Sequence, residues 1–197
     1  HVYCERPMAH TIYEARRMTQ VAKETGVVTQ MGNQGHAGEG LRLYREFIQD
    51  GAIGTVREVH VWSDRAGTAE RPWWPQGIGR PTQTIPVPEH LDWDLWLGPA
   101  RWRPYAKFPN GRGGEATYVP FNWRGWWDFG CGAIGDMAVH NADPAFFALD
   151  LDAPTAVEAE TSGVNDETLP IWNIIRFEFP AQGNRPAIRM TWYDGSK

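Results

Sequence analysis

The feature of this 197-residue chain that most constrains its fold is a strand–helix–strand pattern at its start. Residues 2–4 form a short apolar run, and Val27–Met31 is a second run of the same kind. Between them, Thr11 and Glu14 have capping-box spacing, apolar residues recur at helical intervals, and Gly26 ends the pattern. Two strands joined by a helix lie parallel, so we expect a βαβ unit that forms the end of a larger parallel sheet.

The rest of the chain has a different pattern. Helical spacing predicts a helix around residues 41–48, and alternation predicts a half-buried strand over Thr55–Asp64. Residues 65–129 are rich in Trp and Pro and show only a short helix or turn near 91–97. Three strand-like runs with turns between them should pair antiparallel: Ala156–Ser162, Ile171–Phe179 and Ala187–Tyr193. The predicted class is α/β, with an open, mainly antiparallel sheet packed on helices in the second part.

Charge and cysteine content exclude several classes of function. A net charge of −5 gives no basic surface for nucleic acid. No apolar run reaches the ~18 residues of a membrane-spanning helix, so no membrane partner is expected. Cys4 and Cys131 have no metal-site spacing and fit a reducing compartment or buried thiols. The cytoplasm is the default location, but His1 opens directly into strand-like sequence, so a preceding export signal and a periplasmic location stay open.

Residues 130–144 carry the strongest chemical signal. Asp136 and His140 are four residues apart, which on a helix places them one turn apart on one face. A carboxylate beside an imidazole can hold one ring nitrogen and leave the other for proton transfer. Two other interpretations stay open, a hydrogen-bonded core pair and a metal site. The sequence shows no further ligand at recognisable spacing, so no metal is expected.

The same stretch contains Gly130-x-Gly132-x-x-Gly135, which matches the dinucleotide-binding fingerprint as a string. A true fingerprint follows an apolar strand, whereas residues 122–129 are polar and aromatic. We therefore interpret the match as fortuitous. The glycines should instead let the start of a helix approach a ligand or another backbone segment closely.

Tryptophan is the outlier in composition, with eleven residues, nine of them between Trp62 and Trp127. Such rings serve as core, as oligomer interface or as flat platforms for a sugar ring. The sequence favours an interface slightly and leaves the platform role open. If a sugar binds, the substrate-binding residues we expect are Trp74, Trp126 and His140.

Several motifs resemble one family when they are taken in order. They are Glu5-Arg6-Pro7, the capped helix after it, Val27–Asn33, Gly51–Val56 and Gly132–His140. Together they resemble the NAD(P)-dependent oxidoreductases of the glucose–fructose oxidoreductase, inositol dehydrogenase and MocA family, over essentially the whole chain. The insert around Trp74-Pro75-Gln76-Gly77 resembles a bacterial subgroup whose members often carry export signals.

The resemblance implies a division into two domains. Residues 1–34 would be the end of a Rossmann dinucleotide-binding domain, and residues 35–197 most of an α/β substrate and oligomerisation domain with the insertion at 65–129. The phosphate-binding turn of the Rossmann domain is missing from the sequence. We therefore do not expect these residues alone to bind the cofactor tightly, and their activity in isolation is left open. NAD is favoured over NADP.

The resemblance also assigns residues to the site. The catalytic residues it implies are His140, Asp136 and Arg6. The cofactor-binding residues it implies are Glu5, Arg6, Pro7, Asn33, Gln34, Trp123 and Arg124. Arg6 is a departure, because the family motif has lysine there, and a guanidinium keeps its proton at any working pH. His140 would then move the proton, oriented by Asp136, while Arg6 polarises the hydroxyl.

These assignments imply hydride transfer between a secondary alcohol of a sugar or sugar derivative and nicotinamide. Two alternatives remain, an NAD-dependent glycosidase acting by transient C3 oxidation and elimination, and a non-catalytic oligomerisation or sugar-binding module. We also expect a homo-oligomer formed through the open sheet, because its strands are expected to expose apolar positions. Those positions are Trp172, Ile174, Met190 and Trp192.

Overall fold

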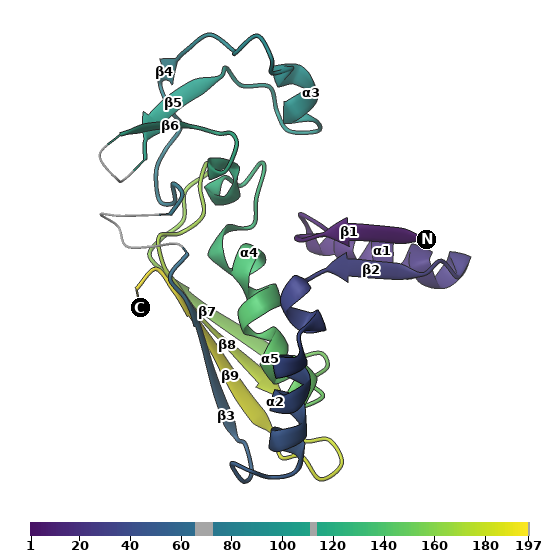
Figure 1. The fold of residues 1–197 in the computed structure, drawn as a ribbon. Coiled ribbons are helices and arrows are strands. Elements are labelled where there is room, and N and C mark those ends of the chain that lie inside the picture. The colour runs from purple at the N-terminus through teal and green to yellow at the C-terminus, as the bar shows by residue number, and fades with distance from the viewer. Residues whose placement is uncertain (66–72, 111–113, 197) are drawn as a thin grey trace. The chain divides into compact units, whose positions relative to one another are not determined.

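A computed structural model describes residues 1–65, 73–110 and 114–196 (Figure 1). The chain forms two compact units, each assembled from segments that are far apart in sequence. The first unit comprises His1–Trp62, Ile134–Ala159 and Ile174–Tyr193, and the second comprises Ser63–Ala133, Glu160–Asn173 and Asp194–Lys197.

The βαβ unit predicted at the start of the chain is confirmed. Strands β1 (Val2–Glu5) and β2 (Thr29–Gly32) pair parallel, and helix α1 (Ile12–Thr25) connects them. The capping box is complete, since the Glu14 amide donates to Thr11 Oγ1 and the Thr11 amide donates to Glu14 Oε2. Glu5 pairs with Gly32, so the two strands end at the same edge of the sheet. The residues that follow each strand, Arg6 and Asn33, therefore leave from a common edge.

A four-stranded sheet dominates the rest of the first unit (Figure 1). Its strands are β3 (Glu58–Ser63), β7 (Ala156–Thr161), β8 (Asn173–Phe179) and β9 (Ile188–Asp194), in the order β3-β9-β8-β7. Strands β8 and β9 are antiparallel. The Arg189 amide donates to the Arg57 carbonyl, which joins the start of β9 to the start of β3 and makes that pair parallel. The mainly antiparallel sheet expected from the sequence is thus confirmed.

Helices cover one face of this sheet. Helices α4 (Gly132–Asn141) and α5 (Asp143–Ala148) pack on it directly. Helix α2 (Glu39–Gln49) follows the 3-10 helix η1 (Gln34–Ala37) and packs against α5. The core between sheet and helices contains Phe179, Ile188, Met190 and Trp192, with Met137 of α4 packed against them. The expectation that Met190 and Trp192 are exposed is therefore wrong, because both are at most 3 % exposed. Strand alternation places them on the same face as Ile188, which is the helix side.

The other face of the sheet is largely polar. Glu178 of β8 and Arg189 of β9 form an ion pair of 2.8 Å there. On β3, Trp62 is 69 % exposed, and the His60 ring stacks on Tyr193 of β9. Oligomer formation through this sheet stays a prediction, with Trp62 rather than Met190 or Trp192 as its apolar element.

The second unit has an aromatic core. A three-stranded antiparallel sheet, β4 (Gln83–Thr84), β5 (Ala106–Pro109) and β6 (Glu115–Thr117), is accompanied by α3 (Trp93–Leu97) and the 3-10 helix η2 (Asn122–Gly125). The short helix expected near 91–97 is present. The rings pack edge-to-face or stacked at centroid separations of 4.9–5.6 Å, and they belong to Trp93, Tyr105, Phe108, Tyr118 and Trp126. Such packing explains Trp93 and Trp126 as core residues without a ligand.

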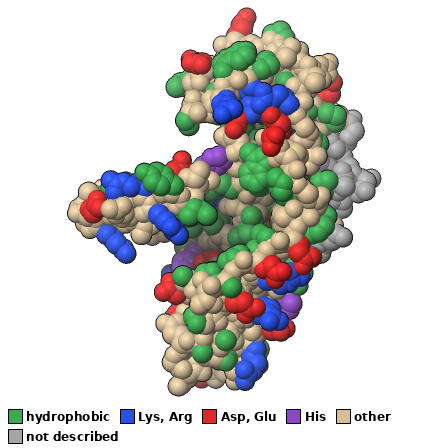
Figure 2. Space-filling model, turned by 180° about the vertical axis from the view of Figure 1, so that it is seen from behind, with side chains coloured by type: hydrophobic (Ala, Val, Ile, Leu, Met, Phe, Trp, Pro, Cys, Tyr) green, Lys and Arg blue, Asp and Glu red, His purple; other side chains and the backbone are tan. Residues whose placement is uncertain are grey.

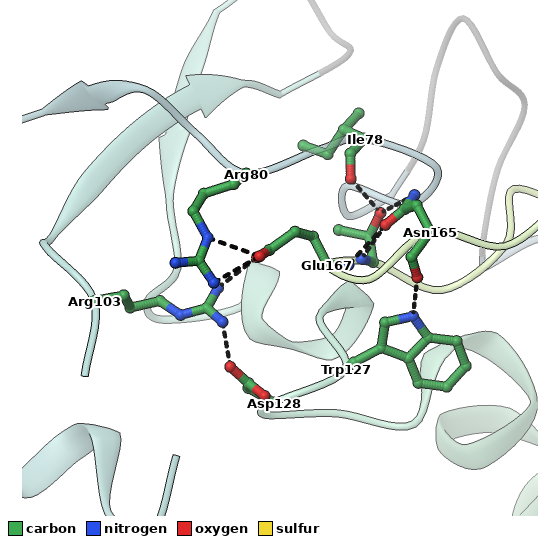
Figure 3. A network of polar contacts seen from close by, with 8 residues as sticks. Ile78, Arg80, Arg103, Trp127, Asp128, Asn165 and Glu167 are labelled. Carbon is green, nitrogen blue, oxygen red and sulfur yellow. Dashed lines mark hydrogen bonds and ion pairs between the residues drawn. The ribbon is translucent and has the colours of Figure 1, made fainter. Parts of the chain in front are cut away.

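A charge network lies beside this aromatic core (Figure 3). The Arg103 side chain is only 4 % exposed, and it donates to Glu167 at 3.0 Å and to Asp128. Arg80, which is 55 % exposed, reaches the same Glu167 from the solvent side. Phe129 lies 5.2 Å from the Arg103 guanidinium. The network fixes the segment around Glu167 against the insertion, because every partner it joins belongs to the second unit.

Charged side chains of both signs lie on the surface. On the face shown in Figure 2, acidic and basic side chains of the described residues are interspersed and form no continuous basic stripe. Among the described residues, no helix has both the length and the apolar character needed to cross a bilayer.

Candidate active site

His140 lies in the last turn of α4, one turn after Asp136. The helical spacing predicted for this pair is correct, and Asp136 is buried at 8 % exposure while His140 is half-buried. Both residues belong to the first unit, as do Arg6 and Asn33. The geometry around the imidazole is therefore defined within one compact body.

The amide of Asn33 binds one nitrogen of the imidazole. Asn33 Oδ1 lies 2.7 Å from His140 Nδ1, and Asn33 Nδ2 donates to the carbonyl of Val139, the residue before the histidine. An amide oxygen only accepts hydrogen bonds, and the Nδ2 bond to a carbonyl fixes which end of the amide faces the ring. His140 Nδ1 must therefore carry a hydrogen. In the neutral ring, Nε2 then holds the lone pair.

Arg6 forms a hydrogen bond to that lone pair. Its Nε–H donates to His140 Nε2, and this agrees with the tautomer that Asn33 imposes. Burial lowers the pKa of His140 below its ordinary value of 6.5, and the positive charge of Arg6 lowers it further. The negative charges of Asp136 and Asp143 oppose this shift only in part. The net result is a neutral imidazole near pH 7 that is able to accept a proton at Nε2.

Asp136 was expected to orient the imidazole, but Asn33 holds the ring nitrogen. The described hydrogen bonds of the ring go to Asn33 and Arg6, while Asp136 acts on His140 through its charge. The reason is that the Nδ1 side of the ring faces the loop after β2. A helical i, i+4 spacing places two side chains on one face, but it does not decide which group meets the ring nitrogen.

Part of the predicted cofactor set gathers at the same edge. Arg6 and Pro7 are half-buried where β1 ends, and Asn33 occupies the equivalent place after β2. Glu5 and Gln34 are exposed beside them. The carboxyl ends of parallel strands are where open α/β sheets bind ligands, so this edge is a candidate ligand site.

Trp123 and Arg124 belong to the second unit and have contacts of their own there. The guanidinium of Arg124 lies 4.3 Å from the Phe121 ring centroid and 4.7 Å from that of Trp123. Their role in cofactor binding stays a prediction.

Trp74 and Trp126, expected as sugar platforms, are 1 % and 0 % exposed. Trp126 packs against Phe108 and Tyr118, and the indole N–H of Trp74 donates to Gln76. With no ring face open, neither tryptophan can stack on a sugar in this arrangement. Composition alone does not separate a core ring from a platform, and the second unit uses these two rings for packing.

The Gly130–Gly135 stretch does not follow a strand, which agrees with our interpretation of the fingerprint match as fortuitous. It follows η2 and an isolated bridge at Trp126. A Cβ at Gly130 would lie 2.5 Å from the Arg124 carbonyl oxygen. Gly130 is therefore required because the chain packs against its own backbone at this point.

The sequence missed a second polar pair near the site. His36 Nδ1 lies 2.9 Å from both carboxylate oxygens of Asp143, and its ring meets Phe147 edge-to-face. A cavity of about 440 Å³ is bordered by Asn33, His140 and Asp143. No short-range motif announces this pair, because its members are 107 positions apart.

The tautomer assignment predicts how Asn33→Asp behaves. A carboxylate at Nδ1 stabilises the imidazolium, so the pKa of His140 should rise, and any reaction that needs the neutral imidazole as a base should lose activity at a higher pH than in the wild type. The wild-type pKa lies below 6.5, so the unfolded chain binds more protons just below that pH. The free energy of unfolding should therefore fall as pH drops from 6.5 towards the folded-state pKa, and Asn33→Asp should reduce that fall.

Long-range ¹H–¹⁵N NMR of the His140 ring measures both the tautomer and the titration. Gln34→Glu is the matched control, since it adds the same charge to the same loop on an exposed side chain. An upward pKa shift of equal size in both variants would contradict a direct Asn33–His140 contact.

The model of the oxidoreductase family, C-terminal alpha/beta domain (Gfo/Idh/MocA type), matches residues 39–186, which is most of the chain. The chain belongs to this oxidoreductase family. The resemblance drawn from its motifs is thereby confirmed. A comparison with functionally curated proteins gives no match.

Solved structures of similar fold support the same architecture. An oxidoreductase from Sinorhizobium meliloti has a TM-score of 0.54 at 18 % identity, over 98 % of this chain and 38 % of its own. An NAD binding oxidoreductase from Klebsiella pneumoniae has a TM-score of 0.55 at 19 % identity, over 98 % and 41 %. An aldose-aldose oxidoreductase from Caulobacter crescentus, complexed with glycerol, has a TM-score of 0.52 at 17 % identity, over 97 % and 42 %. The chain thus spans about two-fifths of the length of these proteins.

Proposed function

We propose that this member of the oxidoreductase family carries the proton-transferring half of an NAD(P)-dependent dehydrogenase that acts on a secondary alcohol of a sugar or sugar derivative. The observation that supports this most is the state of His140, which is neutral, fixed as the Nδ1–H tautomer, and placed at the carboxyl edge of a parallel strand pair. A bound nicotinamide would supply the hydride acceptor at that edge.

Each residue of the site has a defined task in this proposal. His140 Nε2 takes the hydroxyl proton during oxidation and returns it during reduction. Asn33 keeps Nδ1 protonated so that Nε2 is the only basic atom of the ring. Arg6 gives up its bond to Nε2 when the hydroxyl arrives and stabilises negative charge on the substrate oxygen.

The residues proposed to hold the nicotinamide end of the cofactor are Glu5, Arg6, Pro7, Asn33 and Gln34. The preference for NAD over NADP belongs to the proposal, as do the contributions of Trp123 and Arg124. A sugar substrate is supported by the description of the Caulobacter protein as an aldose-aldose oxidoreductase, although the likeness itself is one of fold.

The test uses the complete encoded polypeptide, NAD⁺ or NADP⁺, and a panel of aldoses, alditols and aldonates deuterated at the carbinol carbons. We expect a substrate-dependent increase in reduced nicotinamide that carries the deuterium. Cleavage of a glycoside without net reduced nicotinamide would favour the glycosidase alternative. Sugar binding without any response to nucleotide would favour the non-catalytic module and refute the proposal.

A further inference from the structure

Arg6 has no acidic partner among the residues that the structure describes. Its described hydrogen bond goes to His140 Nε2, and none of the carboxylates in the described residues forms an ion pair with it, including its exposed neighbour Glu5. Asp143 is engaged by His36. A half-buried guanidinium without a carboxylate is costly, since buried charges in proteins are normally paired. The positive charge of Arg6 therefore lacks a compensating negative charge among the described residues.

The geometry of the guanidinium restricts what that anion can be. With Nε bound to His140, the two terminal nitrogens retain four N–H donors in one plane. A planar fork of this kind matches a carboxylate through two parallel, charge-assisted hydrogen bonds, whereas the lysine of the family motif would offer only a point charge. The replacement of lysine by arginine at residue 6 thus changes the preferred partner.

The bond between Arg6 and His140 places a further condition on the substrate. Nε2 has a single lone pair, so a substrate hydroxyl reaches it only if Arg6 Nε withdraws. A substrate carboxylate compensates for the loss of the Arg6–His140 hydrogen bond, because it is a stronger acceptor for the guanidinium than a neutral imidazole is. A neutral alcohol offers no such compensation.

We propose that Arg6 selects 2-hydroxy carboxylates of the sugar-acid type, with the carboxylate on the Arg6 guanidinium and the 2-hydroxyl on His140 Nε2. The two groups of the substrate must lie on adjacent carbons, since the two protein groups are in direct contact. The reaction is R–CHOH–COO⁻ + NAD⁺ → R–CO–COO⁻ + NADH + H⁺, in which the carbinol hydride reduces the nicotinamide and His140 takes the hydroxyl proton. The assignment of a redox step rests on the proposed function, whereas the binding of the carboxylate by Arg6 does not.

The experiment measures binding and turnover separately. Titration calorimetry of the complete encoded polypeptide, without nucleotide, compares D-gluconate with sorbitol and D-galactonate with galactitol, pairs that differ only in the carboxylate. We expect at least one aldonate to bind ~10-fold or more tightly than its alditol, as a bidentate charge-assisted pair implies. Arg6→Gln should abolish this preference, and Arg6→Lys should retain only part of it. Arg17→Gln is the matched control, because it removes one positive charge from α1, at a side chain that is 50 % exposed.

The outcomes separate the two proposals. If an aldonate binds in an Arg6-dependent way but yields no reduced nicotinamide, the redox function fails and the carboxylate site stands. Equal binding of both members of each pair would overturn the inference. The same follows if Arg17→Gln lowers the preference as much as Arg6→Gln, or if Arg6→Gln raises only the KM for NAD⁺.

Discussion

Replacing His140 with alanine should lower the turnover of alcohol oxidation by ~10²–10⁴-fold, the contribution typical of a positioned general base. The reason is that Nε2 is the basic atom at the strand edge and Asn33 leaves the ring only one site for the incoming proton. The KM for the nicotinamide cofactor should barely change, because the imidazole binds other side chains through both nitrogens. The acid limb of the pH profile that reports His140 should also disappear.

His60→Ala is the matched control for this variant. His60 lies on the polar face of the sheet, where its ring stacks on Tyr193, and it has no place in the proposed chemistry. Steady-state kinetics should therefore give a turnover that is ~10²–10⁴-fold lower in His140→Ala than in His60→Ala. Circular dichroism should confirm that both variants are folded. Turnover in His140→Ala close to that of the wild type would remove His140 from the mechanism.

Replacing Arg103 with methionine should lower the free energy of unfolding by about 3 kcal/mol. Breaking a buried ion pair typically costs ~3–5 kcal/mol, because a buried charge is left uncompensated. We expect the lower end of that range, since Glu167 keeps Arg80 and the Asp128 side chain is 34 % exposed. Urea unfolding followed by near-ultraviolet circular dichroism is the measurement, because the aromatic rings around Arg103 dominate that signal.

Arg80→Met provides the comparison within the same network. It removes a guanidinium from the same carboxylate, but Arg80 is 55 % exposed, and surface pairs of this kind contribute ~0–1 kcal/mol. The two variants should therefore differ by about 2 kcal/mol or more. An equal decrease in the free energy of unfolding in both variants would mean that the burial of Arg103 does not add to its contribution to stability.

Elements with a local signal were predictable from sequence. The capping box at Thr11 and Glu14, the stop at Gly26 and the alternation over Thr55–Asp64 each act between residues a few positions apart, and the helix and strand they predict are present. The Asp136–His140 spacing was equally local, and its helix is present.

Contacts between distant segments were not predictable. Asn33 was assigned to the cofactor by resemblance, but its contact with His140 spans 107 positions and leaves no periodic trace. The strand predicted over Ala187–Tyr193 is present as β9, but Met190 and Trp192 were wrongly expected to be exposed, because a strand pattern does not say which side of the sheet is covered. In the same way, the sequence around Trp74 and Trp126 did not indicate that their indole rings are buried.

The pairing of β3 with β9 has a consequence for how the protein reaches its native state. Most of the second unit lies between these neighbouring strands in the sequence, so the sheet stays incomplete until a very long loop has closed. Loop closure of this kind slows folding, and during synthesis β3 must wait until the much later residues of β9 (Ile188–Asp194) have been made. In that interval Val61 and Trp62 lie on an unpaired strand edge, where another chain can pair with the exposed backbone.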